Sequence, residues 1–159
     1  MIRNARMGDI KKIHKLLQYF ADKDLLLGRS LSSLYDQLKD FSVYVEQAED
    51  DPDQEKLVGV CSFHICWDNL AEIRSLAVID EFHGKGVGRQ LVSKALAEAD
   101  SYGITRVFTL TYQPAFFRKL GFKDIDKAEL PHKVWSDCLN CPQFPDCDEE
   151  AMIWLADNK

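Results

Sequence analysis

The sequence lacks any excess of positive charge, since 20 lysines and arginines stand against 26 aspartates and glutamates, for a formal net charge of −6. Proteins that bind nucleic acids usually present a basic stripe to the phosphates, so that class of protein is disfavoured. Long apolar runs are also missing, whereas a membrane-spanning helix needs about 20 consecutive apolar residues. We therefore expect neither a nucleic-acid partner nor a membrane segment.

Cysteine is scarce as well: the chain has five cysteines among 159 residues, an odd number and too few for a disulfide scaffold. Residues 1–17 carry charge in every turn and lack the apolar core of a secretory signal, so we expect a cytoplasmic protein. Cys138, Cys141 and Cys147 have the ligand type for a structural zinc, but one Cys-x2-Cys pair is a weak pattern. We expect no bound metal, with a zinc site in a flap at 130–150 as the alternative.

The residues that are present suffice for one ordinary domain, because 46% of them are hydrophobic and 11% aromatic. No repeat or linker divides the chain, so we expect a single domain over residues 1–159. The hydrophobic pattern predicts, in order, a strand at 2–5, a helix from Ile10, a helix from Leu31, strands at 41–46 and 57–65 around an acidic turn at 49–55, a strand at 71–79, a helix ending near Gly103, a strand at 106–111, a helix at 114–120, a strand after Gly121 and a strand at 152–155.

Two of these helices carry start signals. Asp9 is placed to cap the helix that follows it, and Ser30 is placed to cap the second helix. The second helix is expected to bury a stripe made of Leu31, Leu34, Tyr35 and Leu38. A strand, a glycine loop, a helix and a further strand then indicate a mixed α/β domain with at least one parallel crossover.

The loop between that strand and helix contains three glycines at alternate positions, Gly84, Gly86 and Gly88, flanked by Lys85 and Arg89. Successive backbone N–H groups at a helix amino terminus form a cradle for an anion, and phosphate is its natural guest. The loop is not a P-loop, because no Gly-Lys-Ser/Thr closes it. It also misses the dinucleotide-binding fingerprint, whose third glycine is replaced by leucine here.

The loop His83-x-x-Gly86-x-Gly88 resembles the Arg/Gln-x-x-Gly-x-Gly/Ala loop of the GNAT superfamily of acetyl-CoA-dependent N-acetyltransferases, although His83 departs from the first position. The preceding strand at 71–78, the stretch 115–122 and the opening Ile2-Arg3-x-Ala5-x-x-x-Asp9 are similar to that family as well. The resemblance implies a mostly antiparallel central sheet flanked by helices, with a parallel pair of strands that splays around the cofactor.

The resemblance also implies acetyl-CoA as the cofactor. Its pantetheine would follow the main chain of the strand, its pyrophosphate would sit on the loop amides, and an aromatic residue of the closing helix would contact it. The residues implied are Leu76, Ala77, Val78, His83, Gly84, Lys85, Gly86, Val87, Gly88, Arg89 and Phe117.

Attack on a thioester needs a neutral amine, so a general base is useful near neutral pH. Glu72 stands where several members of the family carry a carboxylate base. Strand alternation places Glu72 and Arg74 on one face together with Leu76 and Val78, so a simple ion pair is the alternative role. Tyr112 is the nearest candidate for a general acid, because Phe117 occupies the family's usual tyrosine position, but Tyr112 could equally be a packing residue.

Within the superfamily the closest resemblance is to short N-acetylglutamate synthase-like enzymes, carried by Gly28-Arg29-Ser30, by Leu110-Thr111 and by the cysteine-containing tail. It implies transfer of acetyl to the α-amine of glutamate or glutamine, in arginine biosynthesis. Arg29, Arg74 and Lys133 are the candidate cations for the acceptor's carboxylates. A peptide, protein or small-amine acetyltransferase and a non-catalytic acyl-CoA-binding module are the alternatives, and a homodimer is left open.

Overall fold

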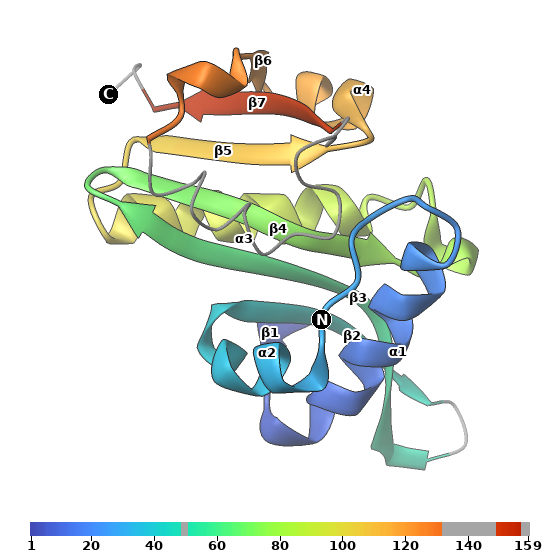
Figure 1. Cartoon of the computed structure of the whole chain (residues 1–159). Helices are drawn as coiled ribbons and strands as arrows, with labels where there is room; N and C mark the ends of the chain where they lie inside the picture. Colours follow the sequence, from blue (N-terminus) through green and yellow to red (C-terminus); the bar gives the residue numbers. More distant parts are fainter. Residues whose placement is uncertain (49–50, 132–148, 157–159) are drawn as a thin grey trace. The chain divides into compact units, whose positions relative to one another are not determined.

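The computed structural model describes residues 1–48, 51–131 and 149–156 (Figure 1). Its strands are β1 (Ile2–Asn4), β2 (Phe41–Ala48), β3 (Asp51–Trp67), β4 (Leu70–Val78), β5 (Arg106–Thr111), β6 (Lys123–Asp124) and β7 (Glu150–Leu155). Its helices are α1 (Ile10–Ala21), α2 (Leu31–Asp36), α3 (Val87–Ser101) and α4 (Pro114–Lys119), with 3-10 turns η1 (Met7–Asp9), η2 (Leu38–Asp40), η3 (Asp80–Phe82) and η4 (Lys127–Glu129).

The strands form one sheet in the order β1-β2-β3-β4-β5-β7-β6. The pairs β1–β2, β2–β3, β5–β7 and β6–β7 are antiparallel, whereas β4 and β5 run parallel and are joined through α3. The predicted mixed, mostly antiparallel sheet with a parallel pair is therefore confirmed. The chain divides into two compact units, Met1–Phe63 with Arg74–Ala95 and His64–Ile73 with Leu96–Lys159.

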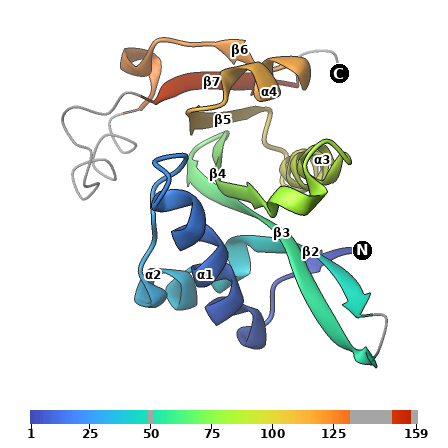
Figure 2. The ribbon, with the colours of Figure 1, turned by 90° about the vertical axis from the view of Figure 1, so that its right-hand side faces the viewer.

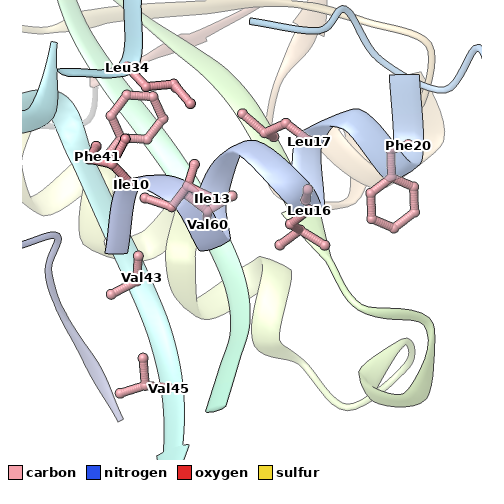
Figure 3. Packing of buried hydrophobic residues seen from close by; sticks show 11 residues of the cluster. Ile10, Ile13, Leu16, Leu17, Phe20, Leu34, Phe41, Val43, Val45 and Val60 are labelled. Atoms are coloured by element: carbon pink, nitrogen blue, oxygen red, sulfur yellow. The ribbon is translucent and has the colours of Figure 1, made fainter. Parts of the chain in front are cut away.

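The core of the first unit lies where α1 and α2 cover one face of β2 and β3 (Figures 2 and 3). The apolar face of α1 is buried as its helical spacing predicted, and each such side chain contributes roughly 1.5–3 kcal/mol relative to exposure. It packs with residues that alternate along β2 and with one residue of β3. The buried members are Ile10, Ile13, Leu16, Leu17, Phe20, Leu34, Phe41, Val43, Val45, Val60 and Ala77.

The first part of α3 packs on β3 at a close approach that requires glycine. A Cβ added at Gly59 would come within 3.0 Å of Leu91 Cδ1 and 3.2 Å of Val87 Cγ1. Lys94 of the same helix donates hydrogen bonds to Asn4 Oδ1 at 2.9 Å and to Ser42 Oγ at 2.7 Å. These contacts fix the amino terminus of α3, and with it the glycine loop.

The second unit is built on β5, which pairs with β4 on one side and with β7 on the other. Its core contains Phe108 and Leu70, both fully buried, with partly buried Leu110 and Ile125 against it. None of the described helices, in either unit, has the length and apolar character that crossing a membrane requires.

Three predictions about local structure need correction. Asp9 makes no cap hydrogen bond to α1; its carboxylate instead accepts from Arg3 at 2.8 Å and from the Arg6 amide at 2.7 Å, because a buried acid needs a cation. The expected acidic turn is partly strand, since β3 begins at Asp51 and Glu55 pairs with Arg3 at 2.9 Å.

The second helix does begin at its predicted cap, because Ser30 Oγ accepts from the Ser33 amide at 3.1 Å. Its predicted buried stripe is wrong in part, since only Leu34 is buried while Leu31 and Tyr35 are exposed. The helix ends at Asp36, so it is too short to turn a full apolar stripe toward the core.

Candidate functional site

The predicted glycine loop lies in the first unit, between η3 and the start of α3. Gly84 and Gly86 have φ values of 77° and 82°, which glycine adopts without the strain that a Cβ would bring. A Cβ added at Gly84 would meet no protein atom within 4 Å, and one at Gly86 would meet only the ends of the Arg89 and Gln90 side chains. The loop backbone is therefore open to a ligand.

The hydrogen bonding of α3 shows which amides such a ligand could use. The Gln90 amide donates to the Gly86 carbonyl at 3.1 Å, which begins the helical pattern. Helix geometry leaves the preceding amides of Val87, Gly88 and Arg89 without an acceptor inside the helix. With the helix dipole and two cationic side chains, Lys85 and Arg89, this loop has the features of an anion-binding cradle.

One ring nitrogen and the backbone amide of His83 are hydrogen-bonded within the protein. Its Nε2 lies 2.7 Å from the Val78 carbonyl, and its ring stacks on Phe20 with a centroid distance of 6.2 Å. Its amide donates to the Asp80 carbonyl at 3.1 Å. His83 thus joins the start of the loop to the end of β4 and to α1, and its predicted contact with the cofactor stays a prediction.

The strand that leads into the loop contains an irregularity that the sequence did not signal. Ser75, in the middle of β4, has a φ of 53°, in the left-handed region. A residue in this conformation bends a strand and interrupts its alternation, as in a β-bulge. The expected regular alternation of Glu72, Arg74, Leu76 and Val78 is therefore wrong across this point.

The bulge coincides with the end of the parallel pairing. The register of β4 with β5 runs from Ala71 opposite Val107 to Ile73 opposite Thr109, and β4 continues beyond it to Val78. Within the second unit Thr109 Oγ1 closes this pairing with a 2.9 Å hydrogen bond to the Ile73 carbonyl. The main chain predicted to hold pantetheine, Leu76 to Val78, follows the bulge directly.

The two candidate catalytic residues lie in the second unit. Glu72 is buried, with 7% of its surface exposed, and Cys66 Sγ lies 3.9 Å from Glu72 Oε1 as a hydrogen-bond donor. Tyr112 follows β5 directly and is half-buried. A general base must be able to accept a proton, and the carboxylate of Glu72, on the strand before the loop, is the candidate for that role.

Phe117 occupies an aromatic cluster in the second unit. It is buried, and its ring makes edge-to-face contacts with Phe116 and Phe122, each at a centroid distance of 5.1 Å. These contacts give it a core role, and its predicted contact with the cofactor stays a prediction.

The acceptor cation predicted at Arg29 lies in the first unit and is held at several points. Nη2 donates to Ser33 Oγ at 2.8 Å and to Gln37 Oε1, and Nη1 donates to Ser75 Oγ at 3.5 Å. The guanidinium also lies over the Phe41 ring, with Cζ 5.3 Å from its centroid. A half-buried, oriented guanidinium supplies a local positive charge that can attract a carboxylate.

The partners of Arg29 were not predicted, although a signal for two of them exists. Ser33 and Gln37 follow Arg29 at intervals of four residues, which places them on one side of a helix. Of the other acceptor candidates, Arg74 is half-buried on β4, next in sequence to Ser75. Lys133 lies outside the described residues.

The predicted metal alternative also falls outside the described residues, because Cys138, Cys141 and Cys147 do so. In the part of the chain that the structure describes, no group of three or more potential ligands could hold a metal ion. Cys61 and Cys66 are buried free cysteines. Among the described residues, the first unit thus contains a glycine loop, a bulged strand and an oriented arginine, and the second unit contains a buried carboxylate.

Comparison with known proteins shows which family the chain is similar to. The model of the acetyltransferase (GNAT) family matches residues 13–122, which include most of α1 and all of the bulged strand, the glycine loop and α4. A Chlorobaculum tepidum protein, named an uncharacterized N-acetyltransferase, is 39% identical over 96% of this chain and 94% of its own length. The amino-acid acetyltransferase of Mycobacterium tuberculosis is 33% identical over 86% of this chain and 76% of its own length.

A solved structure shows the same architecture. The crystal structure of N-acetylglutamate synthase from Neisseria gonorrhoeae, complexed with coenzyme A and L-arginine, matches with a TM-score of 0.76 and 25% identity. The match covers 98% of this chain but 32% of the synthase chain. The likeness therefore concerns one part of that larger enzyme.

Proposed function

The chain belongs to the GNAT acetyltransferase family and uses acetyl-CoA as its acetyl donor, and we propose that its acceptor is the α-amine of free glutamate or glutamine. The observation that carries the choice of acceptor is Arg29, a guanidinium oriented by several contacts in an acidic protein. In an acidic protein the carboxylates of such an amino acid need a local cation. The name of the N-acetylglutamate synthase it resembles supports the same choice.

The residues of the cofactor loop would hold the donor. The amides of Gly84 to Arg89 would bind its pyrophosphate, with Lys85 and Arg89 adding positive charge. The main chain of Leu76 to Val78 would bind the pantetheine. Acetyl-CoA supplies a thioester whose carbonyl carbon accepts the amine.

Glu72 would take the proton that the acceptor's ammonium must lose, directly or through one water. Arg29, with Arg74 and Lys133, would bind the acceptor's carboxylates. The C–N bond then forms as the C–S bond breaks. Because a thiol has a pKa of roughly 8.5, CoA can leave without a dedicated acid, and Tyr112 is the candidate donor if one is used.

Acetylation of glutamate would be the first committed step of arginine biosynthesis, and we propose that the enzyme works in the cytoplasm.

The test is turnover of acetyl-CoA with glutamate, glutamine, lysine and a basic peptide, with products read by mass spectrometry. We expect glutamate or glutamine to be acetylated far faster than the other two. Equal turnover of the basic peptide would reject the amino-acid assignment, and CoA binding without any turnover would favour a non-catalytic module.

A further inference from the structure

Three of the contacts of Arg29 come from one short stretch of chain. Ser33 and Gln37, at four and eight residues beyond Arg29, bind the same guanidinium nitrogen, and Phe41 supplies the ring beneath it. Ser33 and Gln37 are half-buried and Phe41 is buried. We call Ser33, Gln37 and Phe41 the Arg29 seat.

The seat has a physical consequence for binding. A free arginine side chain samples many rotamers, and holding one of them for a ligand costs conformational entropy. Two hydrogen bonds and a cation–π contact hold the guanidinium before any acceptor arrives. Ser33 supplies a hydroxyl and Gln37 an amide oxygen, so these two acceptors orient the guanidinium through neutral groups.

The seat is also joined to the strand that leads to the cofactor loop. Arg29 Nη1 donates to Ser75 Oγ at 3.5 Å, and Ser75 is the residue whose left-handed conformation forms the bulge in β4. The guanidinium therefore has fixed neighbours on both α2 and β4. Its position depends on side chains that are not themselves needed to bind a carboxylate.

We propose that Gln37 and Ser33 are positioning residues that set the enzyme's affinity for the acceptor's carboxylate by orienting Arg29, an inference that rests on the proposed function. Gln37 would act through Arg29 and not on the amino acid directly. Loss of Gln37 Oε1 should therefore weaken acceptor binding while leaving the use of acetyl-CoA unchanged.

The test is a double-mutant cycle of Gln37→Met and Arg29→Ala, read as KM for glutamate or glutamine, KM for acetyl-CoA and kcat. Methionine keeps the length of the glutamine side chain and removes its acceptor. Gln37→Met should raise the acceptor KM by about 10-fold, the usual effect of losing a hydrogen bond to a charged group. The acetyl-CoA KM should stay the same within about twofold.

In the Arg29→Ala background, Gln37→Met should have no further effect, because residues that act through one another are not additive. Gln18→Met is the matched control, since Gln18 is a helical glutamine of the same unit whose amide binds Asp22 at 2.8 Å instead of a guanidinium. It should leave all three constants unchanged.

An equal rise in acceptor KM in both backgrounds, or no rise in either, would overturn the positioning role. A fall in Tm shared by Gln37→Met and the double variant without a KM effect would leave only a structural role and would overturn it too. Wild-type protein that acetylates no amino acid would reject the proposed function, and the inference with it, before any variant is compared.

Discussion

Glu72 is the residue on which the proposed chemistry depends most directly. The sequence placed it on a strand before the glycine loop, and the structure buries it beside the Cys66 thiol. Burial shows that Glu72 is not a solvated surface carboxylate, and a buried acid must be satisfied by specific neighbours. Its proximity to Cys66 was not predicted. The two residues lie on either side of the turn at Asp68-Asn69, and which side chains meet there depends on the register of the hairpin.

Glu72→Gln should lower kcat by about 100-fold at neutral pH, the usual contribution of a positioned general base. Thermal protection by CoA should be retained, because the substitution does not touch the loop. The loss should shrink at alkaline pH, where more of the acceptor amine is already neutral. Steady-state kinetics from pH 6 to 10 would measure this, with the exposed Glu150→Gln as the control. An unchanged rate at neutral pH would make Glu72 a structural residue.

The contacts and backbone conformations of single residues in the site could not be predicted from the sequence. Arg29 was predicted as a candidate cation. Its contact with Ser75 was not predicted, because the two residues lie far apart in the sequence. Nothing about a serine in a strand signals a positive φ, because serine favours the extended region as other residues do. The bulge is imposed by the surrounding structure and is visible only there.

At the scale of elements, predictions were most accurate where a periodic pattern and a strong boundary signal coincide. α1 follows its apolar spacing, and β5 spans the predicted residues Arg106–Thr111. The predicted end of α3 at Gly103 is also confirmed, where a φ of 76° follows the helix. The buried stripe predicted for the second helix was too long. Leu31 and Tyr35 of α2 are exposed, and Leu38 lies in the 3-10 turn η2 that follows.

The glycine loop offers a test with a control inside the same chain. Gly84 and Gly103 have φ values of 77° and 76°, and a Cβ at either would meet no protein atom within 4 Å. Alanine at each should therefore cost a similar stability, about 1 kcal/mol, because both impose the same backbone strain. We expect Gly84→Ala alone to weaken CoA binding, since only its Cβ would stand in the proposed cradle.

Isothermal titration of CoA into the two variants would show this, with Tm values read alongside. We expect at least about 10-fold weaker binding for Gly84→Ala and wild-type affinity for Gly103→Ala. Equal affinities in the two variants would remove Gly84 from the cofactor site.

For the whole molecule, the sequence predicted the fold class and the crossover but not the order of the strands. The crossover follows from a local signal, a strand, a loop, a helix and a strand in succession. The position of β7 between β5 and β6 depends on pairing between Arg106–Thr111 and the distant residues Glu150–Leu155. Such long-range partners leave no local pattern, so hydrophobic periodicity alone does not select them.

The first unit also contains a charge network that links β1, η1 and β3. Arg3 on β1 bonds Asp9 at 2.8 Å and Glu55 on β3 at 2.9 Å. Burial alone would raise the pKa of Asp9, but hydrogen bonds from Arg3 and from the Arg6 amide lower it below the usual 3.8. The Arg3 hydrogen bond likewise lowers the pKa of Glu55.

Because the pKa of Asp9 is lower in the folded than in the unfolded state, its contribution to stability is present above pH 3.8 and is lost as the pH falls below that value. Asp9→Asn should lower Tm by about 5 °C at pH 7, since it removes charged hydrogen bonds with Arg3. Its Tm should then fall less steeply than that of the wild type between pH 4 and 2, and the two curves should converge. Thermal unfolding at a series of pH values would measure both curves, with the exposed Asp36→Asn as the control. Parallel curves for wild type and Asp9→Asn would show that acid destabilises the protein through other carboxylates.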